Sequence, residues 1–320
     1  MTAVDLPRKR HAGISEHALS AFDSPQMHRV SIRRLLSRVA HRARAFRRRM
    51  ELARQHPLAP AAITACLAGF GPPPRAVMVH GSLSACGFVK GGAAKVIRLL
   101  RQWAGPATLA MPTHTYSYPG ADGTVEVFDP ASSPSRVGAI TDAFWRQAGV
   151  LRSLHPSHSL AAVGDGASAL VAGHERCDTP CGSGTPYLKL VEQDAGVLMF
   201  GVSLNTYTLF HTAEDAAGVG YLYEPAPCVL KVREPGGCVR DFPMRRQDMK
   251  VVRRFAAMDV WLEARGLLQR RRCGRGEILW LPHVAAVHEA VTTALRAEPW
   301  LLVEPSARPV APALQVVSPV

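Results

Sequence analysis

A histidine and a glutamate in the sequence have the spacing of a proton-transfer pair. His211 and Glu214 follow the stretch 204–210, which is typical of a helix start after a buried strand. On a helix, residues three apart share one face, so the carboxylate can orient the imidazole and stabilise its charge. A neutral imidazole held in this way is a suitable general base for an amine nucleophile. A histidine that merely caps or stabilises a helix has the same spacing, so the pair alone leaves both interpretations open.

A glycine-rich loop is the second candidate for chemistry. It runs from His80 to Gly92 and joins the apolar run Ala76–Val79 to a predicted helix. Such a loop presents backbone N–H groups and a helix N-terminus, which bind phosphate groups, and Ser82 and Ser84 add hydroxyl groups. Glycines in strand–helix turns also serve packing alone. The Walker pattern GxxxxGK[ST] is absent, so we do not predict a Walker-type nucleotide site.

Three other motifs carry less weight. His155 and His158 stand in a loop before an apolar run, and a His-x2-Cys-x3-Cys stretch occupies 174–181. A structural zinc site usually needs four ligands and no second pair stands nearby, so we predict no metal site. The stretch Arg271–Gly276 matches the pyrophosphate signature R-x-x-G-x-G, but it precedes a predicted strand instead of opening a helix. We interpret it as a chance match.

Composition restricts the class of protein. The seven cysteines are odd in number and contain no CxxC pair, so we expect free thiols in a reducing compartment. No apolar run approaches the ~18–20 residues of a membrane-spanning helix. The N-terminus has early charge but lacks the apolar block of a secretory signal. These features predict a cytoplasmic, globular protein without a membrane span.

The net charge of +13 is concentrated near the N-terminus. Residues 1–60 contain 13 Lys and Arg against four Asp and Glu, and the remaining residues contain 25 against 21. Apolar residues recur at helical spacing over 28–54 with arginines between them, which predicts a basic amphipathic helix. This helix could be simply solvated, could contact nucleic acid, an acidic partner or anionic lipid, or could be a targeting segment. The excess charge therefore says little about the substrate of the main domain.

Strand and helix patterns alternate along the rest of the chain. Buried strands are predicted at 76–79, 108–111, 160–163, 197–201 and 278–281. Helices are predicted at 93–103, 135–146, 251–264 and 284–297. The alternation predicts an α/β domain over 58–303, with a mixed central sheet sandwiched by helices. A basic, helical extension (1–57) precedes this domain, and a loose, Pro-rich tail (304–320) follows it.

Six motifs occur in the order found in a known enzyme family. They are VHGSLSACGFVKGG, GPATLAMPT, FDPASSPSRVGAI, RSLHPSHSLAAVG, GSGTPYLKL and LMFGVSLNTYTLFHTAED. In this combination the sequence resembles the aminoglycoside 3-N-acetyltransferase family over about residues 76–225. A weaker match continues to about residue 303, and the first 57 residues lie outside it. Gly81, Lys90 and Cys181 differ from the residues that are common in the family.

The resemblance implies transfer of an acetyl group from acetyl-CoA, the co-substrate, to an amine of an aminoglycoside-like small molecule. His211 would be the catalytic base, Glu214 its partner, and His155 would lie beside the thioester. The residues implied to line the coenzyme site are Ser82, Leu83, Gly92, Pro134 and Arg152.

Two other interpretations stay open. The protein could be a biosynthetic acyltransferase that modifies another metabolite or uses another donor. It could also be a catalytically idle relative that binds polyanions through its N-terminal helix. The presence of His155 together with the His211–Glu214 pair favours an enzyme.

Overall fold

A computed structural model describes residues 47, 50–51, 54–55, 57–120 and 123–308. Contacts within the chain divide it into two units, residues 1–51 and 52–320. Most of the predicted basic helix at 28–54 and most of the predicted tail lie outside the described residues; residues 47, 50–51 and 54 of the predicted helix are described and are helical. The α/β fold belongs to the second unit. None of the helices in its described part has the length and apolar content needed to span a bilayer.

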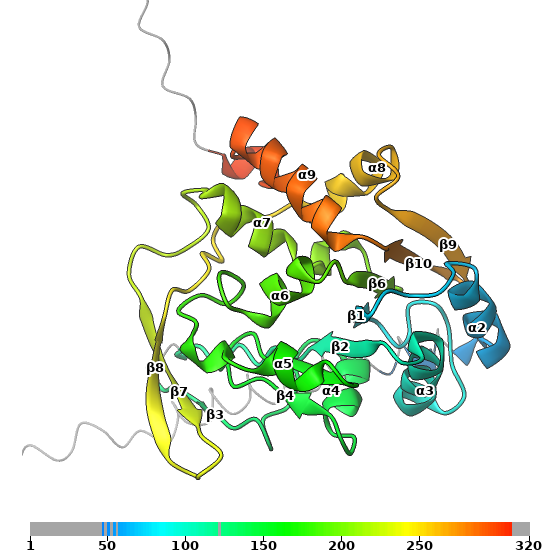
Figure 1. Cartoon of the computed structure of the whole chain (residues 1–320), viewed down its shortest axis with the longest axis horizontal. Helices are drawn as coiled ribbons and strands as arrows, with labels where there is room; N and C mark the ends of the chain where they lie inside the picture. The colour runs from blue at the N-terminus through cyan, green and yellow to red at the C-terminus, as the bar shows by residue number, and fades with distance from the viewer. Residues whose placement is uncertain (1–46, 48–49, 52–53, 56, 121–122, 309–320) are drawn as a thin grey trace, which may run out of the picture. The chain divides into compact units, whose positions relative to one another are not determined.

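A seven-stranded mixed sheet forms the centre of this unit (Figure 1). Its strand order is β4-β5-β2-β1-β6-β10-β9. The strands are β1 (Ala76–Gly81), β2 (Thr108–Pro112), β4 (Leu151–Arg152), β5 (Leu160–Val163), β6 (Gly196–Phe200), β9 (Gln269–Cys273) and β10 (Gly276–Leu281). β1 pairs in parallel with both β2 and β6, and the other pairs are antiparallel. The predicted fold class is confirmed.

Helices cover both faces of the sheet. One face packs against α2 (Pro60–Ala68), α3 (Gly92–Ala104) and α4 (Ala139–Trp145). The other packs against α5 (Ala167–Val171), α6 (Pro186–Glu192), α7 (Phe210–Ala217), α8 (Met258–Glu263) and α9 (Val284–Ala297). Along β1, Val77 and Val79 point to the first core, and Ala76 and Met78 to the second. Strands buried on both faces must be apolar throughout, which explains the continuous apolar runs in the sequence.

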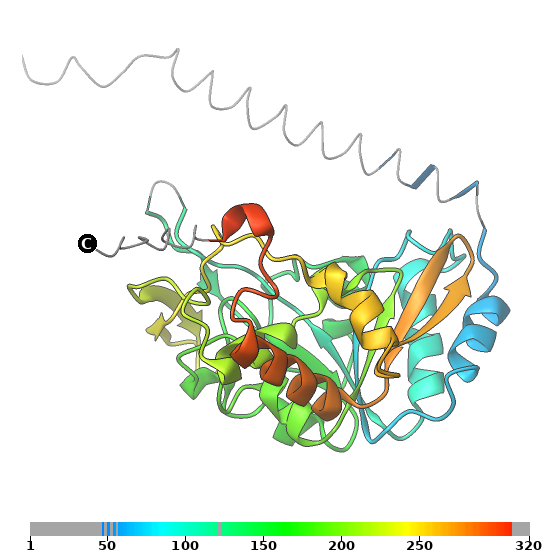
Figure 2. The same ribbon diagram turned by 90° about the horizontal axis from the view of Figure 1, so that it is seen from above.

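The β9–β10 hairpin holds the glycine-rich loop in place. Figure 2 shows this hairpin at the same end of the unit as α2 and α3. The N–H of Arg275 donates to Cys86 O at 3.0 Å, and its guanidinium donates to Ser84 O at 2.9 Å. A Cβ at Gly274 would lie 2.1 Å from Cys86 O, so the close approach requires glycine. The stretch Arg271–Gly276 is thus a hairpin turn, as its sequence context indicated.

A second, three-stranded sheet was not predicted. It consists of β3 (Val127–Phe128), β7 (Cys228–Arg233) and β8 (Val239–Met244), in the order β3-β7-β8. It lies at the opposite end of the unit from β9 and β10 (Figures 1 and 2). Its small apolar core contains Phe128, Leu230, Val232, Phe242 and Met244.

Two predicted helices begin later than expected. Residues 135–138 form a loop, because Gly138 has a φ of 134°, outside the helical region. The prediction at 251–264 was wrong for its first residues, since Arg253 pairs with Val303 in an isolated β-bridge. Short 3-10 helices complete the fold: η2 (His174–Arg176), η3 (Leu204–Thr206), η4 (Phe255–Ala257) and η5 (Pro305–Ala307).

Candidate active site

A cavity of about 350 Å³ opens beyond the carboxyl ends of β1, β2 and β6. Its lining comes from five parts of the chain: the ends of β1 and β2 with residues 114 and 116, residues 137 and 141, residue 158, the connection 202–211, and the segment 247–255. In open α/β sheets this edge is the usual ligand site. β1 lies there between β2 and β6, which come from separate parts of the chain. The topology therefore places the cavity where the predicted glycine-rich loop begins.

His211 and Glu214 lie together at this cavity, as their spacing predicted. His211 lines the cavity at the start of α7, and its Nδ1 lies 2.6 Å from Glu214 Oε2. Glu214 is fully buried, and its Oε1 accepts a long hydrogen bond of 3.4 Å from Arg253 Nε. A carboxylate can only accept, so Nδ1 of the imidazole carries the hydrogen. The lone pair of the neutral ring is then on Nε2.

The buried carboxylate is kept ionised by its neighbours. Burial by itself would raise the pKa of Glu214, but the hydrogen bond and charge of His211 and the charge of Arg253 outweigh it and hold the pKa below its ordinary value. Glu214 is therefore a charged hydrogen-bond acceptor that faces the imidazole of His211. This arrangement can take up a proton at Nε2 and stabilise the resulting imidazolium.

Three further histidines line the cavity. Burial lowers the pKa of His80 to about 3, and it lowers the pKa values of His114 and His158 well below the ordinary value. His114 lies 2.8 Å from the hydroxyl of Tyr187 and 3.0 Å from that of Tyr116. The sequence analysis did not predict that His80 and His114 line a cavity. Their only local signal is a position at the end of a buried strand.

His155 does not line this cavity. Its side chain is fully buried, and its Nδ1 accepts from the backbone N–H groups of Ser157 at 3.3 Å and His158 at 3.1 Å. The ring stacks on His174 at 4.3 Å and packs edge-on against Phe242. Burial lowers its pKa well below the ordinary value. The contacts of His155 shape the loop that carries His158.

The 174–181 stretch does not form a ligand set. His174 Nδ1 lies 2.8 Å from Ser153 Oγ, and Cys177 Sγ donates to Gly173 O. Among the described residues, no three His, Cys, Asp or Glu side chains are grouped to hold a metal ion. The seven cysteines are free thiols in the structure.

Of the predicted coenzyme residues in the glycine-rich loop, Ser82 adjoins the cavity lining. The N–H of Ser82 donates to Phe200 O at 2.9 Å, directly after Gly81, which lines the cavity. Leu83 packs against the core under α3, and Gly92 begins α3 with a φ of 58°. None of Ser82, Leu83 and Gly92 lines the cavity itself.

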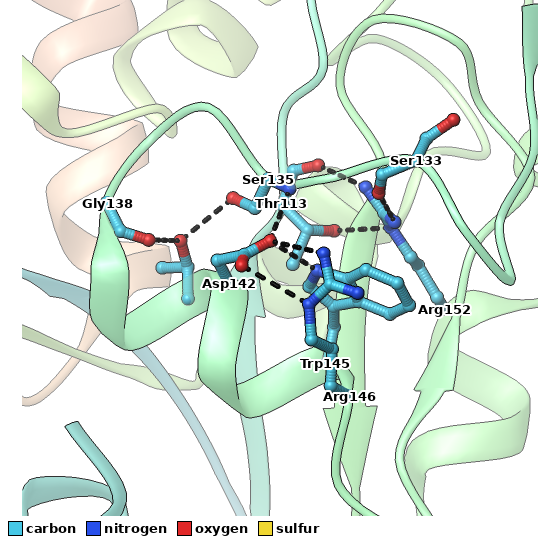
Figure 3. Close-up of polar contacts among 9 residues, drawn as sticks. Thr113, Ser133, Ser135, Gly138, Asp142, Trp145, Arg146 and Arg152 are labelled. Carbon is cyan, nitrogen blue, oxygen red and sulfur yellow. Dashed lines mark hydrogen bonds and ion pairs between the residues drawn. The ribbon is translucent and has the colours of Figure 1, made fainter.

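The guanidinium of Arg152 forms its hydrogen bonds with other residues of the protein (Figure 3). Its guanidinium donates to Thr113 O at 2.8 Å, to Ser133 O, and to the hydroxyls of Thr113 and Ser159. It also stacks on Trp145, with 4.6 Å between the guanidinium carbon and the ring centroid. Burial lowers its pKa to about 10. Arg152 therefore holds the loop at Ser133 rather than presenting a free cation to a ligand.

Asp142 anchors the same loop from α4. Its Oδ1 accepts from the N–H of Ser135 at 2.9 Å and from the indole of Trp145 at 3.0 Å, and Arg146 pairs with it (Figure 3). Pro134, between the anchored residues, is exposed. The predicted coenzyme residue Pro134 therefore lies at the surface, between two residues that are hydrogen-bonded to Arg152 and Asp142.

A family model described as aminoglycoside 3-N-acetyltransferase matches residues 78–294. The chain belongs to this family. The family consists of acyltransferases, so the predicted class of enzyme is confirmed.

Curated relatives of this family are 33% identical to the chain over the residues that align. Aminoglycoside N(3)-acetyltransferase IV from Salmonella sp is 33% identical over 195 residues, 60% of this chain and 69% of the relative. Aminoglycoside N(3)-acetyltransferase VII from Streptomyces paromomycinus is 33% identical over 173 residues, 48% of this chain and 60% of the relative.

Solved structures of family members have the same fold. A variant of AAC(3)-IVa in complex with a gentamicin is 27% identical, with a TM-score of 0.66 over 78% of this chain and 93% of that one. AAC-IIIb in a binary complex with CoASH is 26% identical, with a TM-score of 0.66 over 75% of this chain and 97% of that one. The CoASH complex agrees with the coenzyme predicted for the family.

Proposed function

We propose that the protein is an acetyl-CoA-dependent N-acetyltransferase, in which His211 accepts the proton of the attacking amine. The acceptor is an amine of an aminoglycoside-like small molecule. The observation that carries the proposal is the imidazole of His211, which lines the cavity while its Nδ1 is held 2.6 Å from a buried carboxylate. Family membership and the gentamicin complex of a relative support the same chemistry.

The reaction is a direct acyl transfer. The amine nitrogen attacks the thioester carbonyl, the C–N bond forms, and the ammonium proton passes to Nε2 of His211. The C–S bond then breaks, and the imidazolium returns its proton to the leaving sulfur, so that CoA departs as a thiol. An imidazole suits this step because it can both accept and donate a proton.

Glu214 and Arg253 form the support of the base. The carboxylate stabilises the imidazolium that forms during transfer and fixes the ring so that Nε2 faces the reactants. Arg253 Nε donates to the other oxygen of the Glu214 carboxylate at 3.4 Å, which restricts rotation of the carboxylate. His155 acts indirectly, because its Nδ1 accepts a hydrogen bond from the N–H of His158 and so holds the loop that carries His158.

The coenzyme is proposed to lie along the edge formed by the glycine-rich loop and the anchored 133–138 loop. The side of this edge formed by the glycine-rich loop contains Ser82, Leu83 and Gly92. The side formed by the 133–138 loop contains Pro134. Arg152 contributes by positioning Ser133 and Pro134, because its donors are already used within the protein. The seven free thiols support a reducing compartment, so we infer that the enzyme acts in the cytoplasm.

Thiol release and thermal unfolding test the proposal. The protein with acetyl-CoA and an amine is expected to release CoA thiol, detected with a chromogenic disulfide reagent. A ligand that binds only the native state adds about 2.7 kcal/mol of stability at ~100 times its Kd, so millimolar acetyl-CoA is expected to raise the Tm. An unmoved melting curve together with no thiol release from any amine would refute the proposal.

A further inference from the structure

We propose that Tyr116 is a specificity-determining residue of the cavity, whose hydroxyl oxygen accepts a hydrogen bond from an ammonium group of the acceptor other than the attacking amine. This inference rests on the proposed function, because it assigns a contact to the molecule that the His211 site acylates. It follows from the direction of the hydrogen bonds behind Tyr116.

Three hydrogen bonds link Tyr116 to the backbone through the protein interior. Nδ1 of His114 lies 3.0 Å from the Tyr116 hydroxyl, and its Nε2 lies 2.8 Å from the Tyr187 hydroxyl. The Tyr187 hydroxyl lies 3.0 Å from the carbonyl oxygen of His158 and 3.5 Å from that of Ser159. Both His114 and Tyr187 are buried, so the chain of bonds runs inward from the cavity.

The carbonyl at the inner end sets the direction of all three bonds. A carbonyl oxygen can only accept, so the single hydrogen of the Tyr187 hydroxyl points to His158 O; without it, oxygen lone pairs would face each other at 3.0 Å. The Tyr187 oxygen therefore accepts from Nε2–H of His114. Burial lowers the pKa of His114 well below the ordinary value, so the ring is neutral and Nδ1 has no hydrogen. Nδ1 then accepts from the hydroxyl of Tyr116.

The oxygen of Tyr116 is consequently an acceptor at the cavity. Its one hydrogen is given to His114, and its lone pairs remain on a side chain that lines the cavity. Burial raises the pKa of Tyr116 to about 12, so the phenol keeps this hydrogen at neutral pH. Hydrogen bonds that run in one direction polarise one another, which strengthens the oxygen at the start of the chain as an acceptor. An ammonium group has donors only, so it matches this oxygen.

The backbone at Tyr116 holds the side chain in this position. Tyr116 has a φ of 49°, in the left-handed region that bulky residues rarely adopt. The N–H groups of Thr115 and Tyr116 donate to Ser157 O at 3.0 and 3.3 Å. The N–H of Ser117 donates to Pro156 O at 3.3 Å. A conformation of this kind persists where the surrounding contacts determine it, and such residues cluster at ligand sites.

Tyr116→Phe removes the acceptor oxygen and keeps the ring. Calorimetry of gentamicin, which has several amino groups, with the CoA-saturated protein is expected to give a Kd about ten-fold higher than for the wild type, equivalent to about 1.4 kcal/mol. KM for gentamicin is expected to rise by the same factor while kcat changes less than about two-fold, because the contact is equal in the ground and transition states. An unchanged Kd, or no binding of gentamicin to the wild type, would overturn the inference.

Tyr118→Phe is the matched control. Tyr118 stacks on Tyr116 with 6.4 Å between the ring centroids, and it does not line the cavity. Loss of its hydroxyl is expected to leave the Kd for gentamicin unchanged. Equal weakening in the two variants would show that the conformation of the segment determines binding, and it would overturn the role of the Tyr116 hydroxyl.

The tautomer of His114 tests the direction of the chain. Long-range correlations between the ring nitrogens and carbon-bound hydrogens in NMR spectra distinguish a hydrogen on Nε2 from one on Nδ1, and His114→Gln assigns the signals. We expect the hydrogen on Nε2. A hydrogen on Nδ1 would overturn the inference, because the Tyr116 oxygen would then accept from His114 and direct its own hydrogen to the cavity.

Thiol release measured on the same proteins separates this inference from the proposed function. Weaker gentamicin binding by Tyr116→Phe than by Tyr118→Phe supports the inference even where the wild type releases no thiol, in which case the proposed function alone fails. Thiol release by the wild type together with equal Kd values for wild type and Tyr116→Phe overturns the inference and leaves the proposed function in place.

Discussion

Proton transfer in the proposed mechanism depends on one imidazole. His211→Ala is expected to slow the chemical step by roughly 100- to 10,000-fold, the range for a lost general base. Acetyl-CoA binding is expected to stay unchanged, because the side chain belongs to α7 and not to the coenzyme loops. Single-turnover rates measure the first effect, and calorimetry with CoA measures the second.

A second histidine–carboxylate pair serves as the control for this substitution. His283 Nδ1 lies 2.9 Å from Asp194, but its side chain is 66% exposed and outside the cavity. His283→Ala is expected to keep the full rate. If His211→Ala keeps the rate while His155→Ala abolishes it, the base has been assigned to the wrong histidine.

The carboxylate beside the base makes a smaller contribution. Glu214→Gln keeps the shape of the side chain and removes the charge that stabilises the imidazolium. We expect kcat to fall about ten-fold, which corresponds to about 1.4 kcal/mol of lost transition-state stabilisation. Steady-state kinetics from about pH 6 to 9 measures this change. A loss as large as that of His211→Ala, accompanied by unfolding at assay temperature, would assign Glu214 a structural role instead.

At the scale of elements, Arg152 joins β4 to the loop that precedes α4. Arg152→Lys removes the planar group that donates to Thr113 and Ser133 and stacks on Trp145. Because buried carbonyl acceptors are left without partners, the free energy of unfolding is expected to fall by about 1–3 kcal/mol. Urea unfolding measures it.

Arg146→Lys is the matched control for that substitution. Like Arg152, Arg146 stacks on Trp145, and it pairs with Asp142, but its side chain is 46% exposed. Its change is expected to stay below about 1 kcal/mol, as for surface ion pairs. Equal losses in the two variants would contradict the view that burial makes Arg152 the anchor of the loop.

At the scale of the whole molecule, buried neutral histidines set the response to acid. Burial lowers the pKa of His80 and His174 to about 3, and the pKa values of His114, His155 and His158 lie well below the ordinary one. Below about pH 6.5 the unfolded chain binds protons at these rings and the folded chain does not. Stability therefore rises with pH in this range and is lost as the pH falls.

Each buried histidine is expected to cost up to about 1.4 kcal/mol for each pH unit below about 6.5. Urea midpoints at pH 8, 7, 6 and 5 measure the effect, and the midpoint is expected to be constant above about pH 7 and to drop steeply below about 6. Replacement of the exposed His283 is expected to leave this curve unchanged. A flat curve down to pH 5 would show that these rings are protonated in the native state.

Features that depend on near neighbours in the chain were predictable from the sequence. β1, β2, β5, β6 and β10 were predicted because strands buried on both faces are apolar at every position. The His211–Glu214 pair was predicted because one turn of helix brings residues three apart together. The ordered motifs were sufficient to indicate the family.

The rest of the site depends on contacts between segments that are distant in the sequence. β7 and β8 expose alternate residues and gave no continuous apolar run, so their sheet was missed. Arg152 was expected to face the coenzyme, yet its donors are used by Thr113 and Ser133, which are distant in sequence. Met249 and Gln247 carry no local signal for a cavity. A cavity is formed where separate segments pack together, so its lining and its charge follow from the packing and not from spacing along the chain.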